Sequence, residues 1–89
     1  MPAPVPVAPL LGTWWWMGRL HTARWEPGGE LVIATPGEDW RFTPEGPDRW
    51  RGQTGEQAGE ILRVLRDPAG AVTGLDIATF VFRREPMVD

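Results

Sequence analysis

Hydrophobic and polar residues alternate along this chain over short stretches, with the period of two that is typical of strands buried on one face. The alternation is plainest at residues 39–43, and residues 30–35 are rich in β-branched side chains, which favour strands. Pro-Gly and Pro-Asp pairs interrupt the pattern at short intervals, as tight turns require. The pattern predicts eight strands, at residues 10–18, 20–25, 30–35, 39–43, 49–51, 60–66, 71–75 and 76–84.

Residues 60–66 fit a helical face as well as a strand, so their periodicity alone leaves both open. The four residues that follow, Asp67 to Gly70, carry Pro at the second position and Gly at the fourth, which is the signature of a type I turn. Such a turn joins the two arms of a hairpin. We therefore expect a strand at residues 60–66, paired with residues 71–75.

Three consecutive tryptophans at positions 14–16 are the most informative feature of the sequence. A strand places successive side chains on opposite faces, so Trp14 and Trp16 share one face and Trp15 takes the other. With Trp14 and Trp16 inward, Trp15 lies on the outer face with Met17, and this pair is the candidate partner contact. The candidate interior or ligand-lining residues are Trp14, Trp16, Trp25, Trp40, Trp50, Phe80 and Phe82. Such residues either fill the core of a small domain or line a ligand site, and the sequence leaves both open.

Together these elements predict an all-β fold, a small antiparallel meander of about eight strands closed into a lipocalin-like barrel. The interior of an eight-stranded barrel is just wide enough to be filled by side chains or to hold one small ligand. Residues 1–9 contain four prolines and predict a semi-rigid linker. We expect one β-barrel domain over residues 10–86 and a short tail at residues 87–89.

The composition excludes several classes of function. The chain has no Cys, Ser or Lys, which removes disulfides, thiolate and serine nucleophiles and most other covalent catalysis from this segment. Its nine basic residues are all arginines, scattered among acids at a net charge of −3, so nucleic-acid binding is not expected. No apolar stretch approaches the length of a transmembrane helix, and the N-terminus lacks the positive charge of a signal peptide. No membrane association is expected, and a cytoplasmic location is favoured.

Candidate chemistry is sparse. His21 is the single histidine, and it reads as a strand residue at the surface or packed locally rather than as a general base. Glu56 and Glu60 flank a glycine-rich loop and Glu38 follows a turn, where carboxylates are usually solvated. No dinucleotide-binding, phosphate-loop or calcium-loop motif occurs, so no cofactor, no metal and no catalytic residue is predicted.

Two resemblances extend this interpretation. Gly12-Thr13-Trp14 matches the G-x-W signature of lipocalin-like barrels. A wider resemblance runs through ordered blocks at residues 12–16, 42–46, 48–52, 58–64, 66–67, 75–82 and 84–86. In these blocks the chain resembles the accessory domain appended to the C-terminus of many bacterial serine hydrolases of the beta-lactamase and penicillin-binding-protein class. Where that family usually has an aromatic residue in the loop before Ala58, this chain has Gly55-Glu56-Gln57.

The wider resemblance implies a non-catalytic C-terminal accessory domain. Its partner would be the catalytic serine hydrolase domain of the same parent chain, which would supply the serine and lysine that this segment lacks. The accessory domain is expected to pack on that catalytic domain or to regulate it. The alternative is a free-standing, lipocalin-like binder of a small apolar ligand held inside the barrel.

Overall fold

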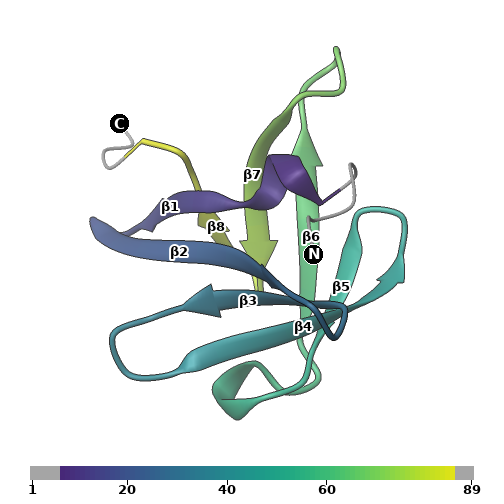
Figure 1. The fold of residues 1–89 in the computed structure, drawn as a ribbon. Helices are drawn as coiled ribbons and strands as arrows, with labels where there is room; N and C mark the ends of the chain where they lie inside the picture. The colour runs from purple at the N-terminus through teal and green to yellow at the C-terminus, as the bar shows by residue number, and fades with distance from the viewer. Residues whose placement is uncertain (1–6, 86–89) are drawn as a thin grey trace.

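The structure, a computed structural model, describes residues 7–85 and confirms the all-β meander. One antiparallel sheet runs in sequence order from β1 to β8 and curls into a nearly closed barrel (Figure 1). The strands are β1 (Gly12–Trp16), β2 (Arg19–Glu26), β3 (Glu30–Ala34), β4 (Asp39–Gly46), β5 (Arg49–Gly52), β6 (Ile61–Arg66), β7 (Val72–Ile77) and β8 (Phe80–Phe82). Two short 3-10 turns, η1 (Ala8–Leu10) and η2 (Gly55–Gln57), lie outside the strands. No helix within residues 7–85 is long and apolar enough to cross a membrane.

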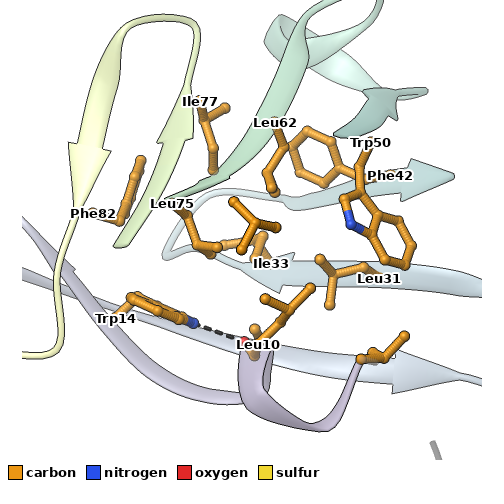
Figure 2. Packing of buried hydrophobic residues seen from close by; sticks show 13 residues of the cluster. Leu10, Trp14, Leu31, Ile33, Phe42, Trp50, Leu62, Leu75, Ile77 and Phe82 are labelled. Carbon is orange, nitrogen blue, oxygen red and sulfur yellow. Dashed lines mark hydrogen bonds between the residues drawn. The ribbon is translucent and has the colours of Figure 1, made fainter. Parts of the chain in front are cut away.

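The inner face of the barrel is a continuous apolar core. Alternate residues of the strands point inward, and the side chains of Trp14, Leu31, Phe42 and Leu62 are completely buried (Figure 2). These residues come from β1, β3, β4 and β6, so the core joins strands that are not neighbours in the sheet. Each large apolar side chain buried in this way contributes about 1.5–3 kcal/mol.

The barrel closes where β1 meets the chain just after β8. The Trp15 N–H donates to the Arg83 carbonyl oxygen at 2.6 Å, and the Arg83 N–H donates to the Trp15 carbonyl oxygen at 2.8 Å. An unpaired strand edge exposes donors and acceptors that invite other chains, and this bridge covers part of that edge. The rest of the seam depends on side chains.

The side chain of Arg84 makes most of the contacts that close the seam. Its guanidinium carbon lies 3.6 Å from the centroid of the Trp14 ring. The group donates to three backbone carbonyl oxygens of the N-terminal arm, those of Pro9 (2.7 Å), Leu11 (3.0 Å) and Thr13 (2.7 Å). The Trp14 indole N–H donates to the Leu10 carbonyl oxygen at 2.8 Å, as the dashed line in Figure 2 marks. Arg84 and Trp14 thus tie the two arms of the chain together.

The predicted linker differs from the structure in residues 7–9. Val7 and Leu10 belong to the buried core, and η1 folds the chain back between them, with a proline in its first turn. Apolar side chains at these two positions gain free energy by covering the barrel, so the chain does not continue as an extended spacer. Residues 1–6 of the predicted linker, residue 86 and the predicted tail at 87–89 lie outside the described residues.

Several strand boundaries also differ from those predicted. The first strand runs from Gly12 to Trp16 rather than over residues 10–18, because Leu10 lies in η1 and Met17 in the turn. Pro44 was expected to end its strand, but β4 continues to Gly46 because the register shifts between Pro44 and Gly46, and a proline is tolerated at such a bulge. The boundary between residues 75 and 76 is wrong, since β7 runs on to Ile77. Ala78 and Thr79 form the turn that follows. This turn contains no glycine, proline or asparagine, so the sequence gives no signal for it.

Replacing Thr79 by glycine is expected to stabilise the domain. Thr79 has φ of 74° and Ala78 has φ of 52°, both in the left-handed region. A β-branched residue in that region is strained, so Thr79→Gly should raise the free energy of unfolding by about 0.5–1 kcal/mol. Urea denaturation followed by tryptophan fluorescence measures the change. The matched control is Thr22→Gly on β2, which should lower stability; a Thr79→Gly variant that is destabilised to the same degree would contradict the strain.

Replacing Arg84 by methionine is expected to destabilise the domain by about 2–4 kcal/mol, because three carbonyl oxygens and the Trp14 ring lose a charged partner. Arg63→Met is the control, since Arg63 is exposed on β6 and should change stability by less than about 0.5 kcal/mol. Thermal and urea unfolding of both variants give the comparison. If both variants lose the same free energy of unfolding, the contacts of Arg84 do not stabilise the seam.

Candidate functional site

The two ends of the barrel are built differently. At one end, η1 carries Val7 and Leu10 into the core near Trp25 and Trp50, whose ring centroids lie 6.3 Å apart. A mainly apolar hollow of about 370 Å³ remains there beside Pro47. We call this the covered end. At the opposite end, which we call the open end, lie the β1–β2, β3–β4 and β7–β8 turns and the loop that contains η2.

Five rings gather at the open end. The Trp16 ring lies 4.8 Å from the Phe80 ring and 5.9 Å from the Phe82 ring, centroid to centroid. His21 lies 5.0 Å from Phe82 and 5.7 Å from Trp40, and Trp40 lies 6.2 Å from Phe82. These residues come from β1, β2, β4 and β8, so the cluster forms only when the meander curls round to bring β8 back to β1.

Two hollows adjoin this aromatic cluster. The larger, an outer cleft of about 470 Å³, lies between the β1–β2 and β3–β4 ends and is lined by Arg19, Glu38 and other residues of those strands. The smaller, an inner recess of about 100 Å³, is lined by Trp16, Trp40, Glu56, Gln57, Ile77, Phe80 and Phe82. The two hollows share Trp16, Trp40 and Glu56, so the recess and the cleft adjoin.

The η2 turn brings Glu56 and Gln57 to this place. Gly52 makes the approach possible, because a Cβ on Gly52 would overlap the Gln57 carbonyl oxygen. Backbone hydrogen bonds fix the loop, with the Gly59 N–H donating to the Gly52 carbonyl oxygen at 2.9 Å and the Gln53 N–H to the Arg41 carbonyl oxygen at 2.7 Å. Glycine at position 52 is therefore a packing requirement, which its place on the inner face of β5 explains.

The carboxylates of the open end are not used in ion pairs within residues 7–85. All seven ion pairs there join Arg24, Arg41, Arg49, Arg51 or Arg66 to other acids. Glu38 accepts a hydrogen bond of 3.4 Å from the Trp40 indole N–H, and Glu56 is exposed. Gln57 is 7% exposed, and its buried Oε1 accepts no hydrogen bond from the described part of the chain. A buried acceptor without a donor is costly, and such groups often mark functional sites.

His21 is a buried, neutral member of the aromatic cluster. Its Nδ1–H donates to the Arg19 carbonyl oxygen at 3.1 Å, which leaves Nε2 as the acceptor. Burial lowers the pKa of His21, and the positive charge of Arg19 acts in the same direction. Within residues 7–85 no three metal-binding side chains converge on it or on any other point. The neutral His21 ring therefore lines the outer cleft and offers a hydrogen-bond acceptor there, without adding a charge.

The structure separates the candidate residues from the sequence into three groups. Trp14, Trp50 and Phe82 are buried in the core, while Trp16, Trp25 and Trp40 pack against it at the two ends. Phe80 shares the inner face with Phe82 but is 48% exposed, because β8 begins at the rim of the open end. On the outer face, Trp15 is half-buried opposite Leu20, and Met17 is 79% exposed in the β1–β2 turn.

Sequence reasoning missed the polar half of the open end. Glu38 and Glu56 are exposed and His21 is packed locally, as the sequence indicates, but the sequence does not place them with Gln57 around two adjoining hollows. Nothing in the local sequence brings residue 38 near residue 56; the pairing of β4 with β5 does so. The signal that was available was the glycine spacing around η2, at positions 52, 55 and 59, which permits close backbone approach.

An eight-stranded antiparallel barrel, covered at one end and open at the other, defines a class of small all-β barrel domain with a recess at its rim. Within that class the chain belongs to the family described as a domain of unknown function (DUF7586), whose pattern matches residues 3–84. The match spans all eight strands. No curated protein matches the chain.

The lowered pKa of His21 predicts a dependence of stability on pH. In the unfolded chain the His21 side chain binds a proton with a pKa near 6.5. In the folded chain burial lowers the pKa of His21, so the ring binds the proton less readily. The stability due to neutral His21 is therefore present above that pH and is lost as the pH falls below it. The free energy of unfolding of the wild type should decline between about pH 7.5 and pH 5.5, whereas that of His21→Phe should stay nearly level.

Tryptophan fluorescence in urea at several pH values provides the measurement. Hydrogen bonds from arginines hold the pKa values of Glu26, Glu45 and Asp48 below their usual range, so these carboxylates titrate at lower pH and do not obscure the window. Parallel curves for the wild type and His21→Phe would show that His21 is not the titrating group.

Proposed function

We propose that this chain is a non-catalytic accessory domain that recognises a partner group with the open end of its barrel. One observation carries the proposal. Trp16, Trp40 and Phe80 stay partly exposed around a hollow that also holds unpaired carboxylates. At the opposite end Val7 and Leu10 of the N-terminal arm lie in the core cluster with Trp50, and the hollow that remains there is mainly apolar.

The geometry is suited to binding. Concave sites lined by aromatic side chains with a few placed polar groups are the usual form of ligand pockets, and tryptophan is enriched among residues that dominate binding energy. The rings of the open end project from strands rather than from loops, so they are held in place before any ligand arrives. Binding then costs little ordering of the site.

For the parent protein we keep the proposal that the resemblance suggests, a beta-lactamase-like serine hydrolase with its catalytic domain upstream. The ordered blocks between residues 12 and 86 support it, as does a composition without Ser, Lys or Cys, since an accessory domain needs no nucleophile of its own. The domain would then contribute recognition, and the rest of the parent chain would contribute the chemistry.

The alternative, an apolar ligand enclosed within the barrel, gains little support. The core is filled by Trp14, Phe42, Phe82 and six further large side chains that are completely or almost completely buried. The hollows described above lie at the ends of the barrel. A ligand of the size that lipocalin-like proteins enclose would have to displace this core, at a cost of several kcal/mol.

A pair of matched substitutions tests the open end. Phe80 and Leu20 are almost equally exposed, at 48% and 46%, but Phe80 belongs to the open end and Leu20 to the outer face beside Trp15. Phe80→Ser should weaken binding of the upstream catalytic domain by about tenfold or more, and Leu20→Ser should change it by less than about twofold. Titration of the isotope-labelled 89-residue chain with the separately expressed catalytic domain, followed by NMR, gives both affinities.

Each result of that titration bears on the proposal. If Leu20→Ser weakens binding and Phe80→Ser does not, the contact lies on the outer surface of Trp15 and Met17, and the proposal for the open end is wrong. If the upstream reading frame carries no S-x-x-K motif, or the catalytic domain does not bind at all, the assignment to a serine hydrolase fails.

A further inference from the structure

We propose that the inner recess of the open end binds a primary alkylammonium group, as carried by a lysine side chain or a small aliphatic amine. The inference rests on the proposed function, in which the open end is the recognition site, and it names the chemistry that this end selects. Aromatic walls, unpaired negative charge, an unused acceptor and a small volume support it independently.

The walls of the recess are faces and edges of four rings, Trp16, Trp40, Phe80 and Phe82, with Ile77 beside them. A cation within about 6 Å of an aromatic centroid is attracted by the ring quadrupole, most strongly by that of tryptophan. The chain already uses this interaction at its seam, where the Arg84 guanidinium lies 3.6 Å from the Trp14 centroid. Four rings line the recess, and no arginine is among the residues of the described chain that line it.

The negative charge of the site also favours a cationic ligand. The carboxylate of Glu56 lines both the recess and the cleft, and that of Glu38 lines the cleft. Neither takes part in the ion pairs of residues 7–85, which lie elsewhere. Arg19 lines the outer cleft but not the recess, so a cation entering the recess meets negative charge and aromatic faces there. A neutral group would gain no attraction from these carboxylates, and an anionic group would be repelled by them.

Gln57 distinguishes a primary ammonium from other cations. The residue lines the recess and is 7% exposed, and its Oε1 accepts no hydrogen bond from residues 7–85. An ammonium carries three N–H donors, so with the buried Gln57 amide turned toward the recess one of them can donate to its Oε1 while a second approaches Glu56. A quaternary ammonium has the charge but no donor and would leave the amide oxygen unsatisfied.

The size of the recess sets the length of the group that fits. About 100 Å³ corresponds to roughly three water molecules at their volume in the liquid. That space holds an ammonium and the nearest methylenes of an alkyl chain, while the outer cleft of about 470 Å³ holds what the chain is attached to. The domain contains no lysine, so a lysine ligand would come from another molecule or another part of a longer chain.

Indole N–H signals in an NMR titration test the assignment, because the six tryptophans report separate positions. Four probes are added to the labelled chain: cadaverine, a lysine-containing peptide, the same peptide with trimethyllysine, and the same peptide with norleucine. The lysine peptide and cadaverine should shift the Trp16 and Trp40 signals in a saturable way and leave those of Trp14 and Trp50 in place. The norleucine peptide should bind at least about tenfold more weakly.

Substitutions at the two ends of the loop give a matched control. Glu56→Gln removes the carboxylate from the recess and should weaken lysine-peptide binding by about tenfold. Glu60→Gln, four positions away and exposed, should leave it within about twofold. Both changes are on the surface and keep the size of the side chain, so folding is not at issue. A difference between cadaverine and the peptide separates a free amine from a peptide-borne lysine as the source.

Several outcomes overturn the inference. A norleucine peptide that binds as tightly as the lysine peptide would make the recess an apolar site, and equal binding of trimethyllysine would remove the role of Gln57. If no probe shifts Trp16 and Trp40 while the catalytic domain still depends on Phe80, the ammonium assignment is wrong and the proposed function stands. If the lysine peptide binds while Phe80→Ser leaves association with the catalytic domain unchanged, the open end is not the contact with that domain, and the ligand chemistry stands.

Discussion

The structure depends on how Trp14 is held between the two arms of the chain. Its indole N–H is satisfied by the Leu10 carbonyl oxygen, and its face is covered by the Arg84 guanidinium. A meander of eight strands has two free edges, and within residues 7–85 these edges are joined by one backbone bridge, between Trp15 and Arg83. Side-chain contacts across the seam replace the hydrogen bonds that a longer pairing would provide, so closure of the barrel depends on a few residues at each terminus.

Closure at the seam also creates the asymmetry between the ends. The same N-terminal arm that reaches Arg84 places Val7 and Leu10 into the covered end. Within residues 7–85 no equivalent terminal arm reaches the open end, where the Trp16 and Phe80 ring centroids lie 4.8 Å apart across the seam. The three consecutive tryptophans therefore have three environments: Trp14 stabilises the core, Trp15 lies on the outer face, and Trp16 forms part of the proposed binding site.

The sequence was informative where the structure follows local rules. The period of two predicted the strands and the inward faces of Trp14 and Trp16, and the Asp67–Gly70 turn settled the β6–β7 hairpin. It failed where contacts between distant residues decide the outcome. Ala78 and Thr79 form a turn without any turn residue because the pairing of β7 with β8 imposes it. Glu38 and Glu56 line the same cleft because β4 pairs with β5, which no motif encodes.

In the loop between β5 and β6, different groups position the backbone and form the exposed surface. Its position is set by main-chain hydrogen bonds and by the missing side chain of Gly52. The side chains of Glu56 and Ala58 are exposed and take little part in holding it. Residues at these positions can therefore be exchanged without rebuilding the barrel. The fold provides a constant frame with an interchangeable segment, through which relatives could diversify what they recognise while their stability stays the same.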